Sequence, residues 1–240
     1  MIDIHVHIIP NVDDGAEDMQ DALLMAELAV ESGVHTIAAT PHCNLPMGFD
    51  NYWSPELAEH FRRFRMEIHK RGLPLEIWTG MEIYATEQVP ELIREKKVIP
   101  INDSGRYLVE FDFYMRSDNI SRLLERICDT GAIPIVAHPE RYICVQKRPQ
   151  IVTDWLDMGC QLQLNRGSFF GSFGRGSFGA ADELLRNGCV TYIASDAHSP
   201  YRRTTYMRDV EGFLSEEYSR KLAEKLLREN PNRFLRPCLP

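Results

Sequence analysis

The feature that most constrains the fold is an alternation of short apolar runs with amphipathic stretches along the chain. The apolar runs are rich in isoleucine and valine, which is typical of buried parallel strands. They cover residues 2–7, 35–40, 75–82, 107–111, 133–138, 161–165 and 191–196. The stretches between them have the spacing of helices. They cover residues 22–33, 55–70, 119–130, 149–159, 180–187 and 215–229. Seven such units without a linker predict one α/β domain over residues 1–240, a distorted (β/α)7 TIM-like barrel.

The charge of the chain argues against one large class of partner. The 240 residues include 27 basic and 35 acidic ones, which gives a net charge of −8. Nucleic-acid binding depends mainly on lysine and arginine neutralising phosphates, so we expect no nucleic-acid partner. No run approaches the ~18 apolar residues of a membrane span. The first residues also lack the basic region and cleavage site of a secretion signal.

The cysteines predict a reducing environment. They are Cys43, Cys128, Cys144, Cys160, Cys189 and Cys238. None of them forms a C-x-x-C pair, and their spacing resembles no disulfide framework. Several lie in apolar runs, where a free cysteine packs as a small hydrophobic residue. We therefore expect a cytoplasmic protein.

Histidines and carboxylates gather where the predicted strands end. His5 and His7 are two residues apart on the first strand, so their side chains point to the same face. The others that end or follow strands are Asp14, His42, Glu82, Glu110, His138, Asp196 and His198. In a barrel these strand ends converge on one rim. Nine such groups together would destabilise the fold without partners, and divalent cations provide them.

The donor atoms of this set are nitrogen and oxygen only. Such donors suit Mn, Fe, Zn or Co rather than a structural zinc site built from cysteines. Nine ligands are too many for one ion, so we expect two or three ions with at least one bridging carboxylate. A single histidine at a strand end is usually structural, but five with four carboxylates are not. The remaining histidines, His35, His60 and His69, fall within strand or helix bodies, and we expect them to be structural or surface residues.

Two arginines follow candidate ligands closely. Arg141 lies three residues after His138, and Arg203 lies five residues after His198. Most arginines are ordinary surface residues, but here the guanidinium forks are placed to grip a phosphate through two parallel hydrogen bonds. Arg202 is the adjacent alternative to Arg203.

Two other segments invite a functional interpretation. Cys160 and Arg166 satisfy the C-x5-R spacing of thiol-based tyrosine phosphatases, whose intervening amides must wrap a phosphate. The intervening residues alternate as in a strand, so we reject a thiol mechanism. Residues 167–179 repeat Gly-Ser-Phe three times without the ending of a P-loop. We expect a flexible loop there, at the rim where it can contribute to ligand binding.

The motifs together resemble one family. They are Asp-Ile-His-x-His-x-x-Pro at residues 3–10, Asp13-Asp14-Gly15, Thr40-Pro41-His42, the His-Pro-Glu-Arg box at 138–141, Asp196-x-His198, Gly-Ser-Phe-Phe-Gly at 167–171 and Asn-Pro-Asn-Arg at 230–233. From residue 2 to about 235 the chain resembles the PHP (polymerase and histidinol phosphatase) family. Within it, the chain resembles the manganese-dependent protein-tyrosine phosphatases of bacterial capsule and exopolysaccharide loci.

The resemblance implies the PHP barrel with three metal ions. The first ion would be held by His5, His7, Glu82 and Asp196. The second would be held by Glu110, His138 and a bridging Glu82, and the third by Asp14, His42 and His198. Many PHP proteins have histidine at the places of Asp14 and Glu110, and carboxylates there match the tyrosine-phosphatase branch. Residues 43–53 match no family pattern.

The resemblance also implies a function. We expect a phosphatase, with Mn²⁺ as its cofactor, that acts on phosphotyrosine in proteins. The implied partner is an autophosphorylating bacterial tyrosine kinase of polysaccharide synthesis, through its tyrosine-rich tail. The alternatives are a histidinol-phosphate phosphatase, a PHP-type exonuclease, which the acidic charge disfavours, and a metal-binding module without enzymatic activity.

The expected chemistry assigns roles to particular residues. Arg141 and Arg203 would stabilise the equatorial phosphoryl oxygens together with the metals. Tyrosinate leaves with a pKa near ~10, so a general acid helps only modestly. His42, His198 and a metal-bound water are the alternatives for that acid. The aromatic residues that either stack on the phenol ring or pack the loop are Phe49, Tyr52 and Trp53.

Overall fold

Parallel strands form the centre of the fold. The computed structural model describes residues 1–46 and 48–235. Its strands are β1 (Ile2–Val6), β2 (Thr36–Ala39), β3 (His42–Cys43), β4 (Glu76–Thr79), β5 (Glu82–Tyr84), β6 (Arg106–Glu110), β7 (Ile133–Ala137), β8 (Gln161–Asn165) and β9 (Tyr192–Ala194). Their hydrogen-bonded order is β1-β2-β4 in one sheet and β3-β5-β6-β7-β8-β9 in the other. Within the described residues, all these pairs are parallel.

Two chain segments pass from the first sheet into the second. β2 continues as β3 across Thr40 and Pro41, and β4 continues as β5 across Gly80 and Met81. Proline has no N–H to donate to a ladder. At Gly80 an added Cβ would lie only 3.1 Å from Cγ2 of Thr40, so the two segments approach closely there. The expectation of one strand over residues 75–82 is therefore wrong, because the ladder breaks at this crossing.

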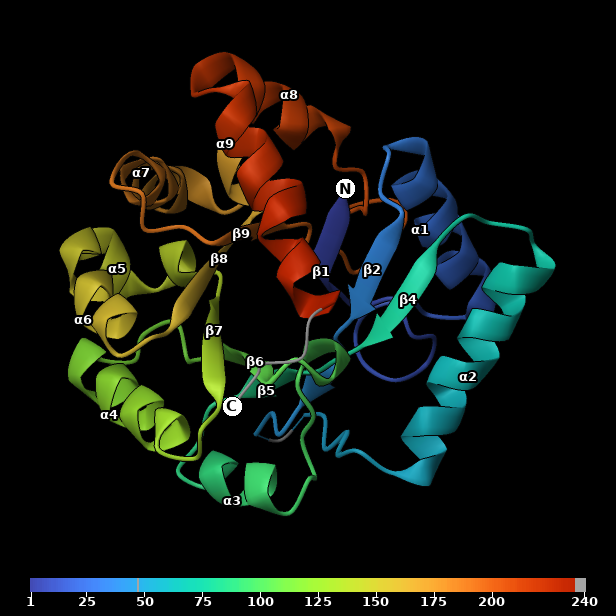
Figure 1. The fold of residues 1–240 in the computed structure, drawn as a ribbon, viewed down its shortest axis with the longest axis horizontal. Coiled ribbons are helices and arrows are strands. Elements are labelled where there is room, and N and C mark those ends of the chain that lie inside the picture. Colours follow the sequence, from blue (N-terminus) through green and yellow to red (C-terminus); the bar gives the residue numbers. More distant parts are fainter. Residues whose placement is uncertain (47, 236–240) are drawn as a thin grey trace.

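The two sheets curve into a distorted barrel (Figure 1). Beyond β9 the chain returns to β1, where Val6 and Ala197 form a parallel bridge. The amide of His7 donates to the Ala197 carbonyl at 2.9 Å, and the amide of Asp196 donates to the His5 carbonyl at 2.9 Å. The expected (β/α)7 barrel architecture is confirmed in this distorted form, because the strands belong to two sheets rather than one continuous ladder.

Apolar side chains fill the interior between the strands. The interior cluster consists of Ile2, Ile4, Ala38, Trp78, Ile101, Leu108, Ile135, Ala137, Tyr192, Ala194 and Phe234. Phe234 comes from η6 (Pro231–Leu235), and its ring centre lies 6.2 Å from that of Trp78 and 5.3 Å from that of Tyr192. The C-terminal segment therefore helps to fill the interior, as TIM-type barrels fill theirs with side chains.

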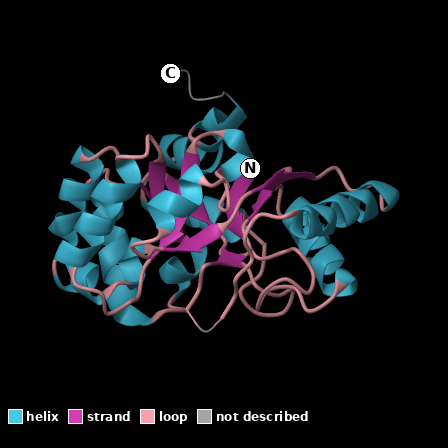
Figure 2. Ribbon diagram, turned by 90° about the horizontal axis from the view of Figure 1, so that it is seen from below, coloured by secondary structure: helices cyan, strands magenta, loops and turns pink. Residues whose placement is uncertain are grey.

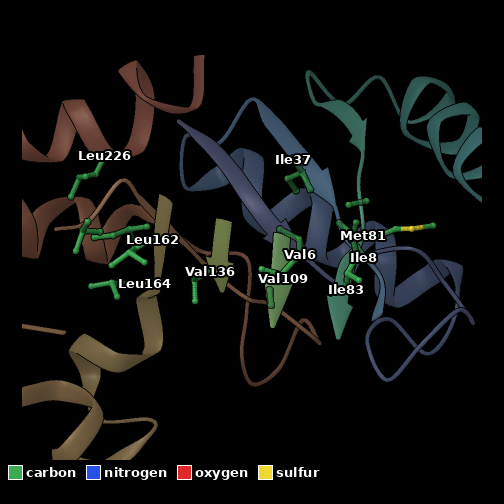
Figure 3. Packing of buried hydrophobic residues seen from close by; sticks show 14 of the residues in the cluster. Val6, Ile8, Ile37, Met81, Ile83, Val109, Val136, Leu162, Leu164 and Leu226 are labelled. Carbon is green, nitrogen blue, oxygen red and sulfur yellow. The ribbon is translucent and has the colours of Figure 1, made fainter. Parts of the chain in front are cut away.

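Helices surround the strands (Figures 1 and 2). They are α1 (Met19–Glu31), α2 (Pro55–Lys70), α3 (Val89–Arg94), α4 (Ser117–Cys128), α5 (Ile143–Lys147), α6 (Val152–Asp157), α7 (Gly174–Arg186), α8 (Arg208–Glu217) and α9 (Arg220–Glu224). In α2 the Ser54 side chain accepts from the amide of Leu57, which caps the helix start. Ile37, Val109, Val136 and Leu162 belong to the large cluster between strands and helices (Figure 3).

Some expectations need correction. Residues 167–179 are not a flexible loop: η4 (Arg166–Phe170) is a 3-10 helix, and α7 begins at Gly174. The apolar pattern also missed α3 and α5, which span only six and five residues.

The described residues contain neither a disulfide nor a helix that could span a membrane. The described cysteines, Cys43, Cys128, Cys144, Cys160 and Cys189, are free thiols. Cys238 lies outside the described residues. None of the helices in residues 1–46 and 48–235 is long and apolar enough to span a bilayer.

Candidate metal centre

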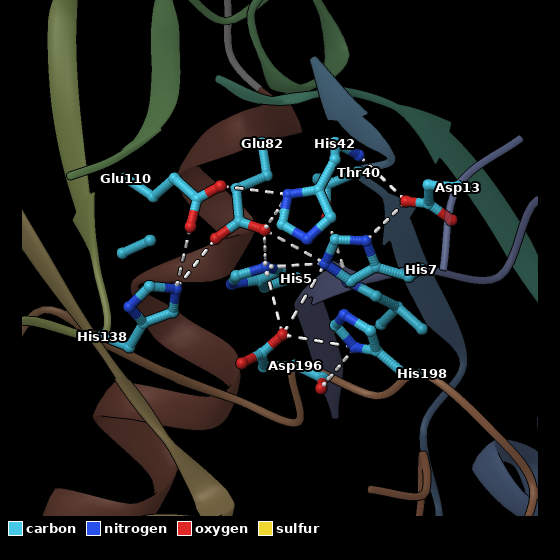
Figure 4. A network of polar contacts seen from close by, with 12 residues as sticks. His5, His7, Asp13, Thr40, His42, Glu82, Glu110, His138, Asp196 and His198 are labelled. Carbon is cyan, nitrogen blue, oxygen red and sulfur yellow. Dashed lines mark hydrogen bonds and ion pairs between the residues drawn. The ribbon is translucent and has the colours of Figure 1, made fainter. Parts of the chain in front are cut away.

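The nine predicted histidines and carboxylates come together at the carboxyl ends of the strands. His5 lies near the end of β1, with His7 just after it. His42 follows β2 and opens the short β3, and Glu82 follows β4 and opens the short β5. Glu110 ends β6, His138 follows β7, and Asp196 and His198 follow β9. Figure 4 shows eight of these side chains pointing toward one another. The ninth, Asp14, has an oxygen 3.6 Å from Nε2 of His42 and 3.5 Å from Nε2 of His198.

The donor atoms form three groups within the described residues, and in each group they lie within 4.8 Å of one another. The groups are His5, His7, Glu82 and Asp196; His7, Asp14, His42 and His198; and His42, Glu82 and Glu110. The first group has the same members as the first predicted ligand set. The second adds His7 to the set predicted for the third ion.

The third group differs from the predicted second set in its histidine. Nδ1 of His42 lies 3.1 Å from Glu82 and 3.0 Å from Glu110. Nε2 of His138 lies 2.9 Å from Oε1 of Glu82 and 3.9 Å from Oε2 of Glu110. Both imidazoles therefore approach this carboxylate pair, and His42 stands between two of the three groups.

One oxygen of Glu82 lies at the focus of the cluster. Its Oε2 atom is 3.1 Å from Nε2 of His5, from Nε2 of His7 and from Nδ1 of His42. Despite these short distances, this buried oxygen makes no hydrogen bond, nor does Oε1 of Glu110. A buried carboxylate oxygen without a hydrogen bond destabilises the folded state, and a cation shared between such oxygens removes this destabilisation. The donor set therefore fits divalent cations that prefer nitrogen and oxygen ligands.

The electrostatics of the cluster favour the same interpretation. Burial lowers the pKa of His5, but the carboxylates of Glu82 and Asp196 outweigh burial and raise it to about 9. In the same way, the pKa of His42 rises to about 10 against the effect of burial, mainly because of Glu82 and Glu110. Burial raises the pKa of Glu82, but His5 and His42 hold it well below its usual range. Protons on the imidazoles balance the carboxylates here, and bound cations would displace them.

Two of the candidate ligands sit in left-handed backbone. The φ angle is 36° at His138 and 51° at Asp196. Such angles cost a non-glycine residue about 1–3 kcal/mol and concentrate at functional sites. His138 directly follows β7 and Asp196 lies two residues after β9, so each left-handed turn redirects the chain at the rim.

Sequence patterns missed the residues that orient these ligands. Asp13 accepts a short hydrogen bond from Nδ1 of His7 at 2.6 Å and another from the amide of His42 at 2.9 Å. A donor bond at Nδ1 leaves Nε2 of His7 free as a ligand. The aspartate was visible in the Asp13-Asp14-Gly15 motif, but spacing alone did not reveal its partners.

A second set of orienting side chains lies on β8. Nδ1 of His5 donates to Gln163 at 3.0 Å, and Nε2 of Gln163 donates to Asn165 at 2.8 Å. Asn165 in turn donates to Oδ2 of Asp196 at 2.5 Å. This chain of amides links two ligands of the first group. In the sequence, Gln163 and Asn165 alternate with leucines. This alternation indicated a strand, but it did not indicate that the two amides orient metal ligands.

Glu140 of the His-Pro-Glu-Arg box is also buried, and its Oε1 accepts from the amide of Asn165 at 2.9 Å and from Oγ of Ser168 at 2.7 Å. It therefore anchors the start of the Gly-Ser-Phe segment beside the cluster. The same segment supplies Phe173, whose ring centre lies 4.2 Å from the guanidinium of Arg141.

The two predicted arginines reach the cluster. Arg203 contacts Oδ2 of Asp196 at 2.5 Å, and Arg141 approaches the same oxygen at 3.5 Å. The guanidinium of Arg141 lies 4.4 Å from the ring centre of Phe113 and 4.2 Å from that of Phe173. Both arginines line a cavity of about 220 Å³, together with Asp14, His42, Glu82, Glu110, His138, Asp196 and His198. Arg202 is exposed and lines a neighbouring hollow of about 650 Å³ instead.

The remaining predicted residues lie around or away from the cluster. Phe49 stacks parallel to the His42 ring at 6.2 Å between ring centres. Tyr52 donates to Asn44 at 2.9 Å and Trp53 packs edge-on against a helix α2 phenylalanine, so both help to pack the loop. Four histidines lie outside the three groups: His138, which nevertheless approaches Glu82 at 2.9 Å, and His35, His60 and His69, which were not predicted as ligands.

The C-x5-R residues do not form a phosphate loop. Cys160 is only 4% exposed and lies just before β8, whereas Arg166 lies just after it. Arg166 forms a bidentate pair with Asp209. The thiol and the guanidinium therefore lie at opposite ends of one strand.

Comparison with known proteins decides the family. Residues 1–236 match the family described as capsular polysaccharide synthesis, CpsB/CapC. The chain belongs to the CpsB/CapC family. It is 31% identical to the tyrosine-protein phosphatase YwqE of Bacillus subtilis, with 98% of this chain and 92% of the relative covered. It is also 31% identical to the tyrosine-protein phosphatase CpsB of Streptococcus pneumoniae, with 98% of each chain covered.

A solved structure agrees with this assignment. It is described as YwqE from Bacillus subtilis and CpsB from Streptococcus pneumoniae, unique metal-dependent tyrosine phosphatases. The TM-score is 0.90 at 29% identity, and 100% of this chain and 96% of the other are covered. Membership of the CpsB/CapC family confirms the resemblance to capsule-locus tyrosine phosphatases that the motifs indicated.

A glycine of this CpsB/CapC chain offers a test of how the ligands are positioned. A Cβ at Gly15 would lie 2.1 Å from the His7 carbonyl oxygen and 2.5 Å from the His7 Cβ. Gly15→Ala must therefore push the loop with Asp13 and Asp14 away from His7. Loss of orienting partners typically weakens metal binding by about 10–100-fold, and we expect that loss of Mn²⁺ affinity in a chelator-competition titration.

The matched control is Gly179→Ala in α7. An added Cβ meets no atom within 4 Å there, so metal affinity should not change. Equal affinities of the two variants would show that Gly15 does not fix the loop.

Proposed function

We propose that this chain is a metal-dependent phosphatase that hydrolyses phosphotyrosine in proteins, within one domain over residues 1–240. The observation that carries the proposal is the cavity of about 220 Å³, where three groups of cation ligands face two arginines. The printed names of the relatives supply the substrate class, because they are tyrosine-protein phosphatases.

The proposal assigns nine residues to two or three divalent cations, with Mn²⁺ as the expected ion and Fe, Zn or Co as alternatives. They are His5, His7, Asp14, His42, Glu82, Glu110, His138, Asp196 and His198. When bound, such cations make water acidic enough to act as a nucleophile at neutral pH and withdraw charge from phosphoryl oxygens. Glu82 is assigned as the bridging ligand because its Oε2 atom contacts imidazoles of two groups.

The arginines are assigned to the phosphoryl group. Each guanidinium has several donors in one plane, and the contacts with Asp196 engage only some of them. The remaining donors of Arg141 and Arg203 can bind equatorial oxygens, whose charge grows in the transition state. The rings of Phe113 and Phe173 both contact the guanidinium of Arg141 and help to position it.

The leaving group requires little help. Tyrosinate has a pKa near ~10, so proton donation contributes only modestly. His42 and His198 both line the cavity, and they remain the two side-chain alternatives for that proton. Phe49, which is stacked on His42, provides an aromatic surface beside them for the phenol ring.

We also propose a phosphoprotein substrate and a cellular compartment for this chain. A tyrosine autokinase of polysaccharide synthesis is the proposed phosphoprotein, in keeping with the description of the family as capsular polysaccharide synthesis proteins. We assign the chain to the cytoplasm, because the free thiols of the described cysteines are consistent with a reducing compartment.

The proposal predicts that no thiol takes part in catalysis. Cys160 is buried before β8, at the opposite end of that strand from Asn165, which contacts Asp196. Cys160→Ser should therefore leave kcat for a phosphotyrosine peptide nearly unchanged. A folded, metal-loaded variant without activity would restore the thiol mechanism.

A comparison of substrates tests the proposed specificity. The manganese-loaded chain should hydrolyse a phosphotyrosine peptide with a much higher kcat/KM than histidinol phosphate or a small nucleotide. A preference for histidinol phosphate would contradict the proposal. Failure to turn over p-nitrophenyl phosphate as well would instead indicate a metal-binding protein without phosphatase activity.

A further inference from the structure

Two cysteines meet at the end of the sheet opposite the metal centre. Cys128 is the last residue of α4, and Cys160 directly precedes β8. Their Sγ atoms are 4.0 Å apart although the residues are 32 positions apart in the sequence. The five residues of β8 separate Cys160 from the ligand-contacting end of that strand. At about 3.3 Å per residue this separation is about 16 Å, so the pair belongs to no part of the candidate active site.

The two thiols differ in the way that reactive and resolving cysteines differ. Cys128 is partly exposed, whereas Cys160 is 4% exposed. A hydrogen bond from the Cys160 thiol lowers the pKa of Cys128, and that same contact together with burial raises the pKa of Cys160. The thiolate is the nucleophilic form that attacks peroxides, and accessible thiolates react first.

We propose that Cys128 and Cys160 form a modification site that a peroxide converts into a disulfide. The Cys128 thiolate attacks one oxygen of hydrogen peroxide, the O–O bond breaks, and a sulfenic acid forms with release of water. The Cys160 sulfur then attacks the sulfenic sulfur, so that the S–S bond forms, the S–O bond breaks and a second water leaves. The two thiols lose two electrons and two protons, and the peroxide is reduced to two water molecules.

The local structure allows this bond. A disulfide needs an S–S length of about 2.05 Å, so the sulfurs must approach by about 2 Å. Cys128 is followed by a turn that ends at Gly131, which has a φ of 85° and open space around it. Asp129 and Gly131 of this turn are exposed, which leaves the turn room to adjust. The bond would tie α4 to β8 and restrict the unfolded chain.

Oxidation should change stability but not catalysis. In a reducing compartment the dithiol is the resting state, and the disulfide forms while oxidant is present. We expect the melting temperature to rise by about 5–10 °C. The metal centre lies at the other end of the strands, so kcat should change less than twofold.

The test treats the full chain, loaded with Mn²⁺, with stoichiometric hydrogen peroxide. Remaining thiols are then alkylated, and the peptides are mapped by mass spectrometry. The expected product links Cys128 to Cys160, and dithiothreitol reverses it. A link from Cys128 to any other cysteine, or an unlinked sulfinic acid at Cys128 in the unaltered chain, would overturn the proposal.

Variants separate the pair from general thiol oxidation. Cys128→Ser should abolish the disulfide and the rise in melting temperature, and Cys160→Ala should leave Cys128 to oxidise further to the sulfinic acid. Cys144→Ser, at another partly buried cysteine, is the matched control and should retain both effects. If Cys128→Ser keeps the rise in melting temperature, the assignment of the site is wrong.

Discussion

Asp196→Ala is expected to lower kcat/KM for a phosphotyrosine peptide by several orders of magnitude. Asp196 lies among the ligand atoms of the first group and also accepts from Asn165 and Arg203. Its removal takes a charged ligand from the cations and leaves Arg203 without its carboxylate. His138→Ala should have a comparable effect, because Nε2 of His138 approaches both Glu82 and Glu110.

These variants need measurements of fold and metal content beside activity. Circular dichroism should show an intact fold, and mass spectrometry of the metals should show fewer ions per chain. His69→Ala is the matched control, because His69 is an exposed histidine of α2 outside the three groups. Full activity of Asp196→Ala with undiminished metal content would remove Asp196 from the proposed ligand set.

Arg141→Ala and Arg203→Ala are each expected to lower kcat by about 10²–10³-fold, the loss typical for one donor to a developing oxyanion. A contact that strengthens in the transition state lowers kcat as well as affinity, so the loss should not be confined to KM. Arg141→Lys should recover little of it, because an ammonium group cannot reproduce the two parallel bonds of the guanidinium. Steady-state kinetics at saturating phosphotyrosine peptide measures this difference.

Arg202→Ala provides the neighbouring control. Arg202 is exposed and lines the adjacent hollow beside Asp14 and His198, but it does not line the cavity that contains Arg141 and Arg203. We expect it to lose less than tenfold in kcat, with metal content unchanged in all three alanine variants. An inactive Arg202→Ala beside a fully active Arg203→Ala would show that the phosphate contact belongs to the other arginine.

The sequence predicted the helices and strands whose periodic apolar pattern follows directly from the burial of one face. The run at 161–165 coincides with β8, and the helix predicted at 55–70 coincides with α2. Both are continuous segments with apolar residues at the period of their structure. The positions of the nine candidate ligands followed in the same way, because parallel strands must deliver their carboxyl ends to one rim.

The features that the sequence did not predict depend on contacts between segments that are distant along the chain. The break between β4 and β5 arises where Gly80 passes close to Thr40 on the neighbouring segment. The Gly-rich stretch near 174 looked flexible, but packing of the buried residues of α7 overrides its weak helix propensity. The bond from His7 to Asp13 could not be predicted either, because a hydrogen-bond partner depends on the path of the backbone rather than on spacing.

We propose that this chain hydrolyses phosphotyrosine through divalent cations held by the nine clustered ligands. The most direct test is a titration of Mn²⁺ into exhaustively chelated chain, with hydrolysis of a phosphotyrosine peptide and bound metal measured on the same samples. We expect no activity in the metal-free chain and recovery in proportion to the metal bound. Full activity in a sample verified to be free of metal would contradict it.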